Sequence, residues 1–245
     1  MKLETSNPRI IKDIIETIAN IIDECKLNIT PDGITVHALD KSHITFVELD
    51  IKKTLFDEYY CETPEQVLID TNQLMQILRR CKNDDILKIE TEPTHITLIF
   101  DGESSRRFRV SLIDNEYESP QPPIIDYPVQ ITTPSNLIKD SLGDSRLFGE
   151  NIIFTVDEDY LHICSQTASG VFGETHIKYL HGENINEVVK SGYSIEMLMN
   201  IFKASKINKE CQLKLGDDKP LMVTFELPMR DGYLLFLLAP RLSTD

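Results

Sequence analysis

The sequence has no tryptophan, only 10 glycines among 245 residues, and a deficit of positive charge, with 25 basic against 40 acidic side chains. The formal charge of −15 argues against a protein that coats nucleic acid with basic surface, because such proteins neutralise phosphates with many Lys and Arg side chains. It argues equally against a binder of anionic membranes. Disorder is not indicated, because a hydrophobic fraction of 41% is ordinary for globular domains.

Long apolar segments and paired cysteines are also missing. Residues 1–8 contain no apolar stretch like that of a signal peptide, so we expect no secretion. The longest apolar run, Tyr233–Ala239, is far too short to cross a bilayer and is expected to be a buried strand. The five cysteines are an odd number without paired spacing, which predicts reduced thiols.

Motifs of the common enzyme classes are absent too. The sequence contains no GxxxxGK[ST] phosphate loop, no GxGxxG fingerprint and no GxSxG nucleophile motif. The six histidines are not spaced with the cysteines as zinc ligands are. Acidic pairs such as Asp84-Asp85 fall in predicted turns, whereas a two-metal nuclease needs carboxylates that converge on one site. We therefore predict no catalytic residue, no metal site and no cofactor.

What the sequence does contain is a repeated pattern of helices and strands. Hydrophobic periodicity predicts helices at residues 9–24, 71–82, 134–147 and 194–209. Alternation predicts strands at residues 27–30, 34–39, 43–51, 86–90, 95–100 and 108–113, and again at 152–156, 160–165, 171–179, 212–215, 221–227 and 233–238.

Residues 114–128 interrupt this pattern near the middle of the chain. Prolines 120, 122, 123 and 128 and four carboxylates indicate an extended connector. The order of elements before it recurs after it, and Leu74–Leu78 matches Leu198–Phe202 at a shift of 124 residues. We therefore predict the α+β class, with two similar domains at residues 1–113 and 129–245.

The charges are unevenly distributed over these elements. The four predicted helices hold 10 of the 25 basic and 7 of the 40 acidic groups, a net charge of +3, which leaves −18 for the rest. Basic residues near helix C-termini can simply complement the helix dipole. Alternatively, the helices form a weakly basic surface on an acidic body, where salt-dependent phosphate contacts occur.

Two segments carry a resemblance to a known family. Leu39-Asp40-Lys41-Ser42-His43-Ile44 resembles the hydrophobic-Asp-x-Ser-His-hydrophobic motif of the sliding clamps called proliferating cell nuclear antigen (PCNA). Pro220–Val223 followed by Tyr233–Arg241 is similar to the family's C-terminal sequence. The order of elements, the connector and the length are also similar, and archaeal members are the most similar.

The resemblance implies a non-enzymatic DNA sliding clamp. Family members are homotrimeric rings with antiparallel sheets outside and helices lining a hole that encircles double-stranded DNA without sequence preference. They tether DNA polymerase, the clamp loader and other replication and repair proteins. Such a chain would be cytoplasmic and associated with the nucleoid, or nuclear in a eukaryote. A subunit of a heteromeric or checkpoint-type clamp, a metal-dependent nuclease and a protein-only scaffold are the alternatives.

The resemblance also assigns residues to three surfaces. The first surface is the lining of the hole, and its expected DNA-facing residues are Lys12, Arg79, Arg80, Lys82, Lys139, Arg146, Lys203 and Lys206. Asp13, Gln76 and Leu147 stand where relatives often carry a basic residue. The subunit interface pairs about Arg107–Ile113 with about Glu174–Tyr179, and centres on Arg109, Val110, Ser111, Leu112, His176, Ile177 and Lys178.

The third surface is a pocket for a partner peptide of the form Gln-x-x-aliphatic-x-x-aromatic-aromatic. Ile44 and Phe46 are equally interpretable as core residues, and Leu237 stands where relatives often have a tyrosine that donates a hydrogen bond. The expected pocket residues are Leu39, His43, Ile44, Phe46, Ile124, Ile125, Pro220, Leu237, Ala239, Pro240 and Arg241.

Overall fold

The computed structural model describes residues 1–114, 117–183, 185 and 187–241, so residues 115 and 116 of the predicted connector lie outside the described part. The chain folds into two compact units. Each unit contains two α-helices and antiparallel strands, which confirms the α+β class. Unit 1 comprises residues 1–41, 47–122 and 226–234, and unit 2 comprises residues 42–46, 123–225 and 235 onward.

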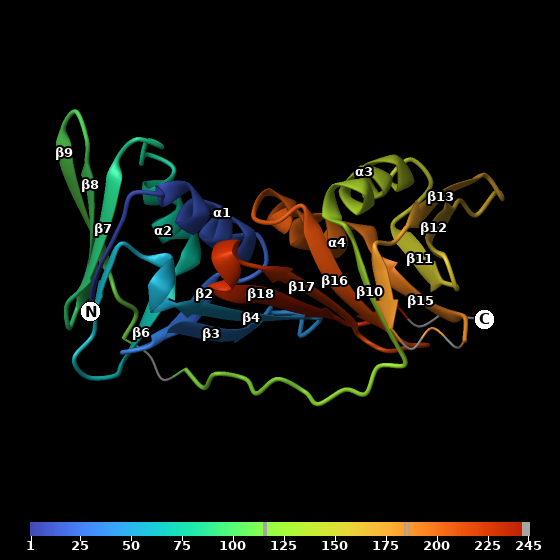
Figure 1. The fold of residues 1–245 in the computed structure, drawn as a ribbon, viewed down its shortest axis with the longest axis horizontal. Coiled ribbons are helices and arrows are strands. Elements are labelled where there is room, and N and C mark those ends of the chain that lie inside the picture. The colour runs from blue at the N-terminus through green and yellow to red at the C-terminus, as the bar shows by residue number, and fades with distance from the viewer. Residues whose placement is uncertain (115–116, 184, 186, 242–245) are drawn as a thin grey trace. The chain divides into compact units, whose positions relative to one another are not determined.

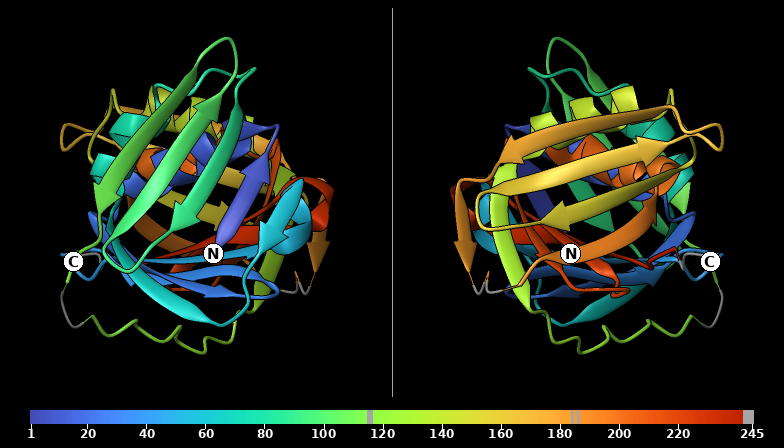
Figure 2. Two further views of the ribbon diagram at one scale, coloured as in Figure 1. Left: turned by 90° about the vertical axis from the view of Figure 1, so that its left-hand side faces the viewer. Right: turned by 90° about the vertical axis from the view of Figure 1, so that its right-hand side faces the viewer.

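One sheet of unit 1 has the strand order β5-β1-β7-β8-β9, so β9 is its last strand (Figure 2, left). Its alternating pattern buries one face: Leu87 and Ile89 of β7 and Ile96 and Leu98 of β8 lie in the core. The strands are β1 (Lys2–Thr5), β5 (Glu58–Tyr60), β7 (Ile86–Thr91), β8 (His95–Asp101) and β9 (Ser105–Ser111).

The remaining strands of unit 1 follow the order β6-β2-β3-β4. A turn at Pro31 and Asp32 joins β2 to β3, with Thr30 opposite Gly33. Gly33 has a φ of 152°, and a Cβ there would lie 2.0 Å from the carbonyl oxygen of Ile51, so the position requires glycine. The strands are β2 (Glu24–Thr30), β3 (Gly33–Leu39), β4 (Thr45–Lys52, from Val47 onward) and β6 (Glu65–Asp70), next to the first residues of β18 (Gly232–Leu238).

Helices α1 (Pro8–Ala19) and α2 (Thr71–Leu78) lie side by side over these strands (Figure 1). The isoleucines of α1 recur at helical spacing and form a stripe that is buried, as the periodicity predicts. Ile14 and Ile18 are each 1% exposed. The predicted end of this helix at Glu24 was wrong. The N–H groups of Ile21 and Ile22 both donate to the Ile18 carbonyl as the chain turns, and Glu24 already begins β2.

Helix α2 begins at the predicted Thr71 but ends four residues earlier than predicted. Asp70 caps its N-terminus, because the Asp70 carboxylate accepts the hydrogen bond from the Gln73 N–H at 2.8 Å. The Thr71 hydroxyl instead donates to the Ile22 and Asp23 carbonyls. The helix ends at Leu78, so the basic residues that follow lie beyond it.

Unit 2 has a sheet of order β13-β12-β11-β15, in which β13 is the last strand (Figure 2, right). A second set of strands follows the order β14-β10-β16-β17, next to the last residues of β18. The strands are β10 (Val129–Pro134), β11 (Asn151–Val156), β12 (Tyr160–Gln166), β13 (Phe172–Lys178), β14 (His181–Glu183), β15 (Val189–Ser194), β16 (Glu210–Leu215) and β17 (Leu221–Glu226).

The helices of unit 2 are α3 (Ser135–Ser145) and α4 (Ile195–Ile201). The predicted helix over 194–209 is shorter than expected, because the chain continues from α4 as a 3₁₀ segment, Phe202–Lys206, that buries Phe202 and Ala204. Among the described residues, no helix is both long and apolar enough to span a membrane.

Candidate functional site

The basic residues expected to face DNA in unit 1 gather around the end of α2. Lys12, half-buried on α1, donates from Nζ to the Cys81 carbonyl at 2.9 Å, so it satisfies a backbone group beyond the helix end. Arg79 is exposed, and its Nη2 lies 3.3 Å from Oε1 of Glu16 on α1. The two helices thus bring a base and an acid together on one surface.

Arg80 and Lys82 complete this group. Both are exposed, and Nζ of Lys82 lies 3.0 Å from Oε2 of Glu103. The Glu103 carboxylate raises the pKa of Lys82 above its ordinary value, which keeps the ammonium charged. Pairing with carboxylates reduces the net positive charge of this surface, so it suits weak contacts with phosphates rather than tight binding.

Unit 2 carries its expected DNA-facing bases on α3 and after α4. Lys139 and Arg146 are exposed, at the middle and the C-terminal cap of α3. Lys206 is exposed on the 3₁₀ segment, whereas Lys203 is half-buried and donates to Asn200 Oδ1 at 3.1 Å. Arg146 and Lys203 line one open cavity of about 540 Å³. Two predicted DNA-facing residues therefore converge on one concave surface.

The expected partner pocket falls almost entirely within unit 2. The Ala239 N–H donates to the Ile44 carbonyl at 2.9 Å, which joins the chain end to the segment after the Asp-x-Ser-His motif. Beyond it, the Arg241 N–H donates to the Gly192 carbonyl at 2.8 Å. Ile44 is 38% exposed and His43 has a φ of 58°. This turn therefore presents an apolar side chain beside the C-terminal segment.

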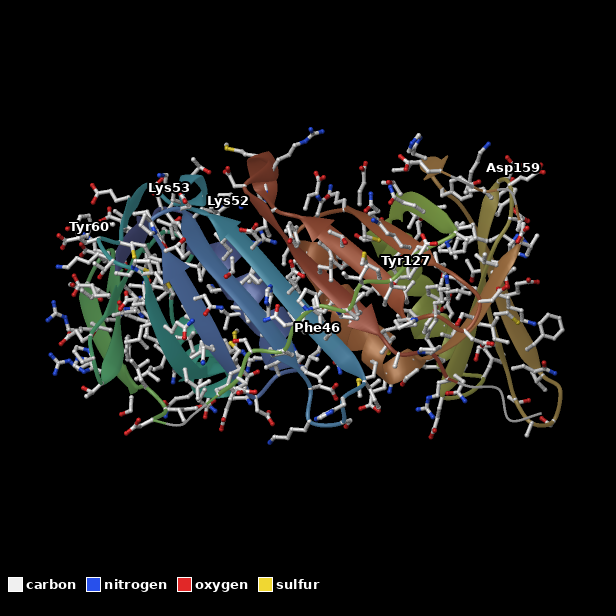
Figure 3. The ribbon with its side chains drawn as sticks, turned by 90° about the horizontal axis from the view of Figure 1, so that it is seen from below. Phe46, Lys52, Lys53, Tyr60, Tyr127 and Asp159 are labelled. Carbon is white, nitrogen blue, oxygen red and sulfur yellow. The ribbon has the colours of Figure 1, made fainter. Side chains whose placement is uncertain are left out.

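The connector is fastened to the same unit by two hydrogen bonds. The Tyr127 hydroxyl donates to the Pro220 carbonyl at 2.8 Å, and Lys219 Nζ donates to the Asp126 carbonyl at 2.6 Å (Figure 3). Burial raises the pKa of Tyr127 well above its ordinary value, so the hydroxyl remains a donor. Ile125 is half-buried and Ile124 is fully exposed. Sequence reasoning missed Tyr127 and Lys219, because nothing local to either residue indicates its distant partner.

Some expected pocket residues are buried in the core. Phe46 is 5% exposed and Leu237 is 4% exposed, so neither side chain offers accessible surface. The burial favours the core interpretation of Phe46. Ala239 and Pro240 are half-buried and Arg241 is exposed. Leu39 belongs to unit 1, where it lines a cavity of about 190 Å³ with Lys41 and Tyr117.

The two segments expected to form the subunit interface are edge strands. β9 and β13 are each the last strand of their sheet in the described part of the chain. Val110 and Ile177 point inward and are buried, whereas Arg109 and Ser111 of β9 and His176 and Lys178 of β13 are exposed. Leu112 follows β9 and donates its N–H to the Thr94 carbonyl at 2.9 Å.

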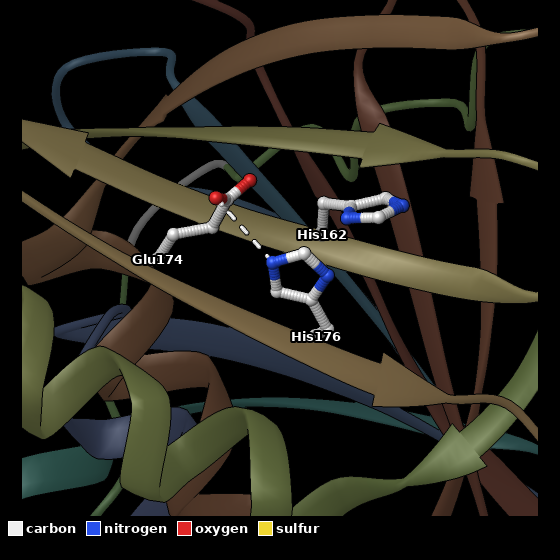
Figure 4. Close-up of side chains that lie close together, drawn as sticks. All are labelled: His162, Glu174 and His176. Atoms are coloured by element: carbon white, nitrogen blue, oxygen red, sulfur yellow. Dashed lines mark ion pairs between the residues drawn. The ribbon is translucent and has the colours of Figure 1, made fainter.

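A cluster that the sequence did not predict lies on β12 and β13. Possible metal-ligand atoms of His162, Glu174 and His176 lie within 4.8 Å of one another (Figure 4). Histidine and cysteine spacing along the chain gave no sign of it, because the residues meet only through the strand register. A signal was nevertheless present: His162 and His176 each fall on one alternating face of a predicted strand.

Comparisons with known sequences agree on one family. Residues 1–119 match the family model described as proliferating cell nuclear antigen, N-terminal domain. A protein of Methanothermobacter thermautotrophicus named DNA polymerase sliding clamp is 40% identical and covers 100% of this chain and 99% of its own length. A protein of that name from Thermococcus onnurineus is 30% identical over 94% of each chain.

Solved structures have the same fold. A chain from the PCNA2–PCNA3 complex of Sulfolobus tokodaii superposes with a TM-score of 0.89 at 24% identity, covering 98% of this chain and 99% of that one. Proliferating cellular nuclear antigen from Entamoeba histolytica superposes with a TM-score of 0.91 at 22% identity, covering 98% of each chain.

Proposed function

This chain belongs to the proliferating cell nuclear antigen family of DNA sliding clamps, and from that premise we propose that three copies close into a ring around duplex DNA. It is a processivity factor rather than an enzyme. We propose that it holds DNA by topology. The homotrimer, the helix-lined hole and the identities of the tethered proteins are our proposals. We also retain the domain limits 1–113 and 129–245, joined by the 114–128 connector, and a cytoplasmic location with the DNA.

Ring closure by the edge strands β9 and β13 is the step that the structure supports most directly. Each is the last strand of its sheet in the described part of the chain, and an exposed edge of unpaired backbone groups recruits another strand. The exposed faces differ in charge, since β9 presents Arg107 and Arg109, whereas β13 presents both Glu174 and Lys178. Pairing β9 of one copy with β13 of the next is a heterologous contact, which generates a closed ring when the rotation fits.

The helices α1 to α4 would then line the hole. Their exposed bases are partly neutralised, as in Arg79–Glu16 and Lys82–Glu103. A lining of this kind makes weak, salt-dependent and sequence-independent phosphate contacts, so the ring remains on DNA without stopping on it. The net charge of −15 opposes tight non-specific binding of DNA elsewhere on the molecule.

Polymerase, the clamp loader and other replication and repair proteins would dock through a short peptide on unit 2. Ile44, the connector at Ile124 and Ile125, and the segment Ala239–Arg241 offer apolar contacts and backbone groups. A peptide with an aliphatic and an aromatic anchor matches these features.

Retention on DNA tests this function. Loaded onto closed circular DNA and washed in moderate salt, the clamp should stay bound, and cutting the circle should release it from the free ends. Release at the same rate from circular and cut DNA would contradict encirclement. Failure to stimulate a cognate polymerase after loading would contradict the processivity role.

A further inference from the structure

The cluster on β12 and β13 is a cross-strand block on one face of a sheet. His162 lies directly opposite His176 in the register, with ring centroids 4.6 Å apart and the rings at 74° to one another. Glu174 lies two residues before His176, and the two side chains approach to 3.3 Å between Oε2 and Nε2. Residues at i and i+2 of a strand share a face, so all three side chains project to the same side.

The spacing suits a single metal ion. Ligand atoms that lie about 2 Å from one zinc ion lie roughly 3–4 Å from each other. The atoms available on His162, Glu174 and His176 are within 4.8 Å of one another, so small side-chain rotations would bring them to one ion (Figure 4). His176 is 52% exposed and Glu174 is 39% exposed, which leaves the site open to an arriving ion.

An outer carboxylate already orients one imidazole. His162 Nε2 lies 2.6 Å from Asp157 Oδ2, and Oδ1 of Asp157 accepts the N–H groups of Asp159 at 3.0 Å and Tyr160 at 2.8 Å. A carboxylate–histidine pair is typical of metal ligands, and it leaves His162 Nδ1 to bind the ion.

Cys164 lies beside the three clustered residues but outside their 4.8 Å group, so its thiol would have to rotate toward them to act as a fourth ligand. It lies directly opposite Glu174 in the register and two residues beyond His162, so it shares their face of the sheet. Leu161 and Ile163, which alternate with these residues, are buried on the other face. Two imidazoles, a thiolate and a carboxylate favour zinc and similar transition metals over Mg²⁺ or Ca²⁺, which prefer all-oxygen ligands.

We propose that His162, Cys164, Glu174 and His176 form a binding site for Zn²⁺ or a similar transition-metal ion on the exposed face of the β12–β13 pair. The bound ion would tie the edge strand β13 to β12. All four residues lie within one sheet of unit 2, so the site requires no residue of a second copy and no DNA, although His176 also belongs to the expected subunit interface.

Direct titration of the untagged, reduced and metal-free chain with Zn²⁺, in competition with a chromogenic chelator, tests the proposal. One ion per chain should bind, and His176→Gln should weaken binding by at least about tenfold. His181→Gln is the matched control, because His181 is also exposed and lies 3.5 Å from the Glu183 carboxylate, but on β14, which belongs to another sheet. Absence of stoichiometric binding, or equal weakening by the two variants, would overturn the site.

Two further variants examine the orienting group and the thiolate. Asp157→Asn should weaken zinc binding by about 10–100-fold, as loss of an outer partner typically does, and an affinity equal to that of the unaltered chain would contradict its role. Co²⁺ in place of zinc should give a sulfur-to-metal charge-transfer absorption that Cys164→Ser removes. Persistence of that absorption in Cys164→Ser would exclude Cys164 as a ligand.

Discussion

Arg106 on the edge strand β9 is paired with the Asp85 carboxylate, which is 2% exposed. The same guanidinium donates from Nη1 to the Arg80 carbonyl at 2.9 Å, and Asp85 also accepts the Lys82 N–H at 2.7 Å. One side chain therefore fastens the strand proposed to join subunits to the basic segment after α2. Its removal would leave a buried carboxylate without its cation.

We predict that Arg106→Ala destabilises unit 1 by about 3 kcal/mol, because breaking a buried ion pair leaves an uncompensated charge. The urea midpoint, followed by circular dichroism, measures this change. Arg9→Ala is the control: Arg9 is 68% exposed and pairs with Asp13 at 3.6 Å, so its loss should shift stability by no more than about 0.5 kcal/mol. Equal effects of the two variants would show that the Asp85 pairing is energetically unimportant.

Charge reversal at Arg79 and Arg80 should weaken DNA contacts without affecting peptide binding. The double variant Arg79→Glu with Arg80→Glu should make the salt dependence of DNA binding shallower by about one to two phosphate contacts. The control is Lys52→Glu with Lys53→Glu, which makes the same change of charge at the end of β4 and the start of the segment after it (Figure 3). Because these residues are not on α1 or α2, the control should not alter the salt dependence. Loss of peptide binding as well would indicate misfolding.

Truncation of Ile44 should weaken the partner site while the ring persists. Ile44→Ala removes an apolar side chain beside the Ala239 backbone and should reduce affinity for the motif peptide about tenfold, or about 1.4 kcal/mol. Pro240→Ala should act in the same direction. Leu147→Ala is the control, since Leu147 is 79% exposed and follows the end of α3, and fluorescence polarisation measures all three. Unchanged affinity for Ile44→Ala would place the pocket elsewhere.

The Tyr127 hydroxyl should hold the connector in place. Tyr127→Phe removes the hydrogen bond to the Pro220 carbonyl and leaves that acceptor unsatisfied, at a cost of about 1 kcal/mol. We expect a lower unfolding midpoint and several-fold weaker binding of the motif peptide. Tyr60→Phe is the control, because Tyr60 is 61% exposed and its hydroxyl lies 3.4 Å from Glu62 Oε2 (Figure 3). A Tyr127→Phe chain that matches the control would show that the hydroxyl does not anchor the connector.

Local sequence pattern predicted most elements of this fold. The isoleucine stripe gave α1, and strict alternation gave β3, β8 and β12 within a residue or two. It failed where alternation is short or weak: β1 has four residues, and β15 carries Ser191, Gly192 and Ser194 in place of apolar residues. Such strands form because a partner strand offers backbone hydrogen bonds, as β7 does for β1.

The candidate sites were predictable to different extents. The bases at Arg79 and Arg80 were visible as a local excess of charge, and the resemblance assigned the pocket. The pairings of Arg106 with Asp85 and of His162 with His176 were not visible, because each depends on register between segments that no local pattern specifies. Burial of Phe46 likewise follows from tertiary packing rather than from its place in an alternating strand.

The central claim is that copies of this chain close a ring through β9 and β13. Light scattering on the purified chain, at micromolar concentration in moderate salt, should give about three times the 28.1 kDa mass of one chain. Arg109→Glu together with Lys178→Glu, which changes charge on both edges, should shift that mass toward one chain. A mass of one chain for the unaltered protein would contradict the homotrimer, and a ring formed only with a second, different chain would identify a heteromeric clamp.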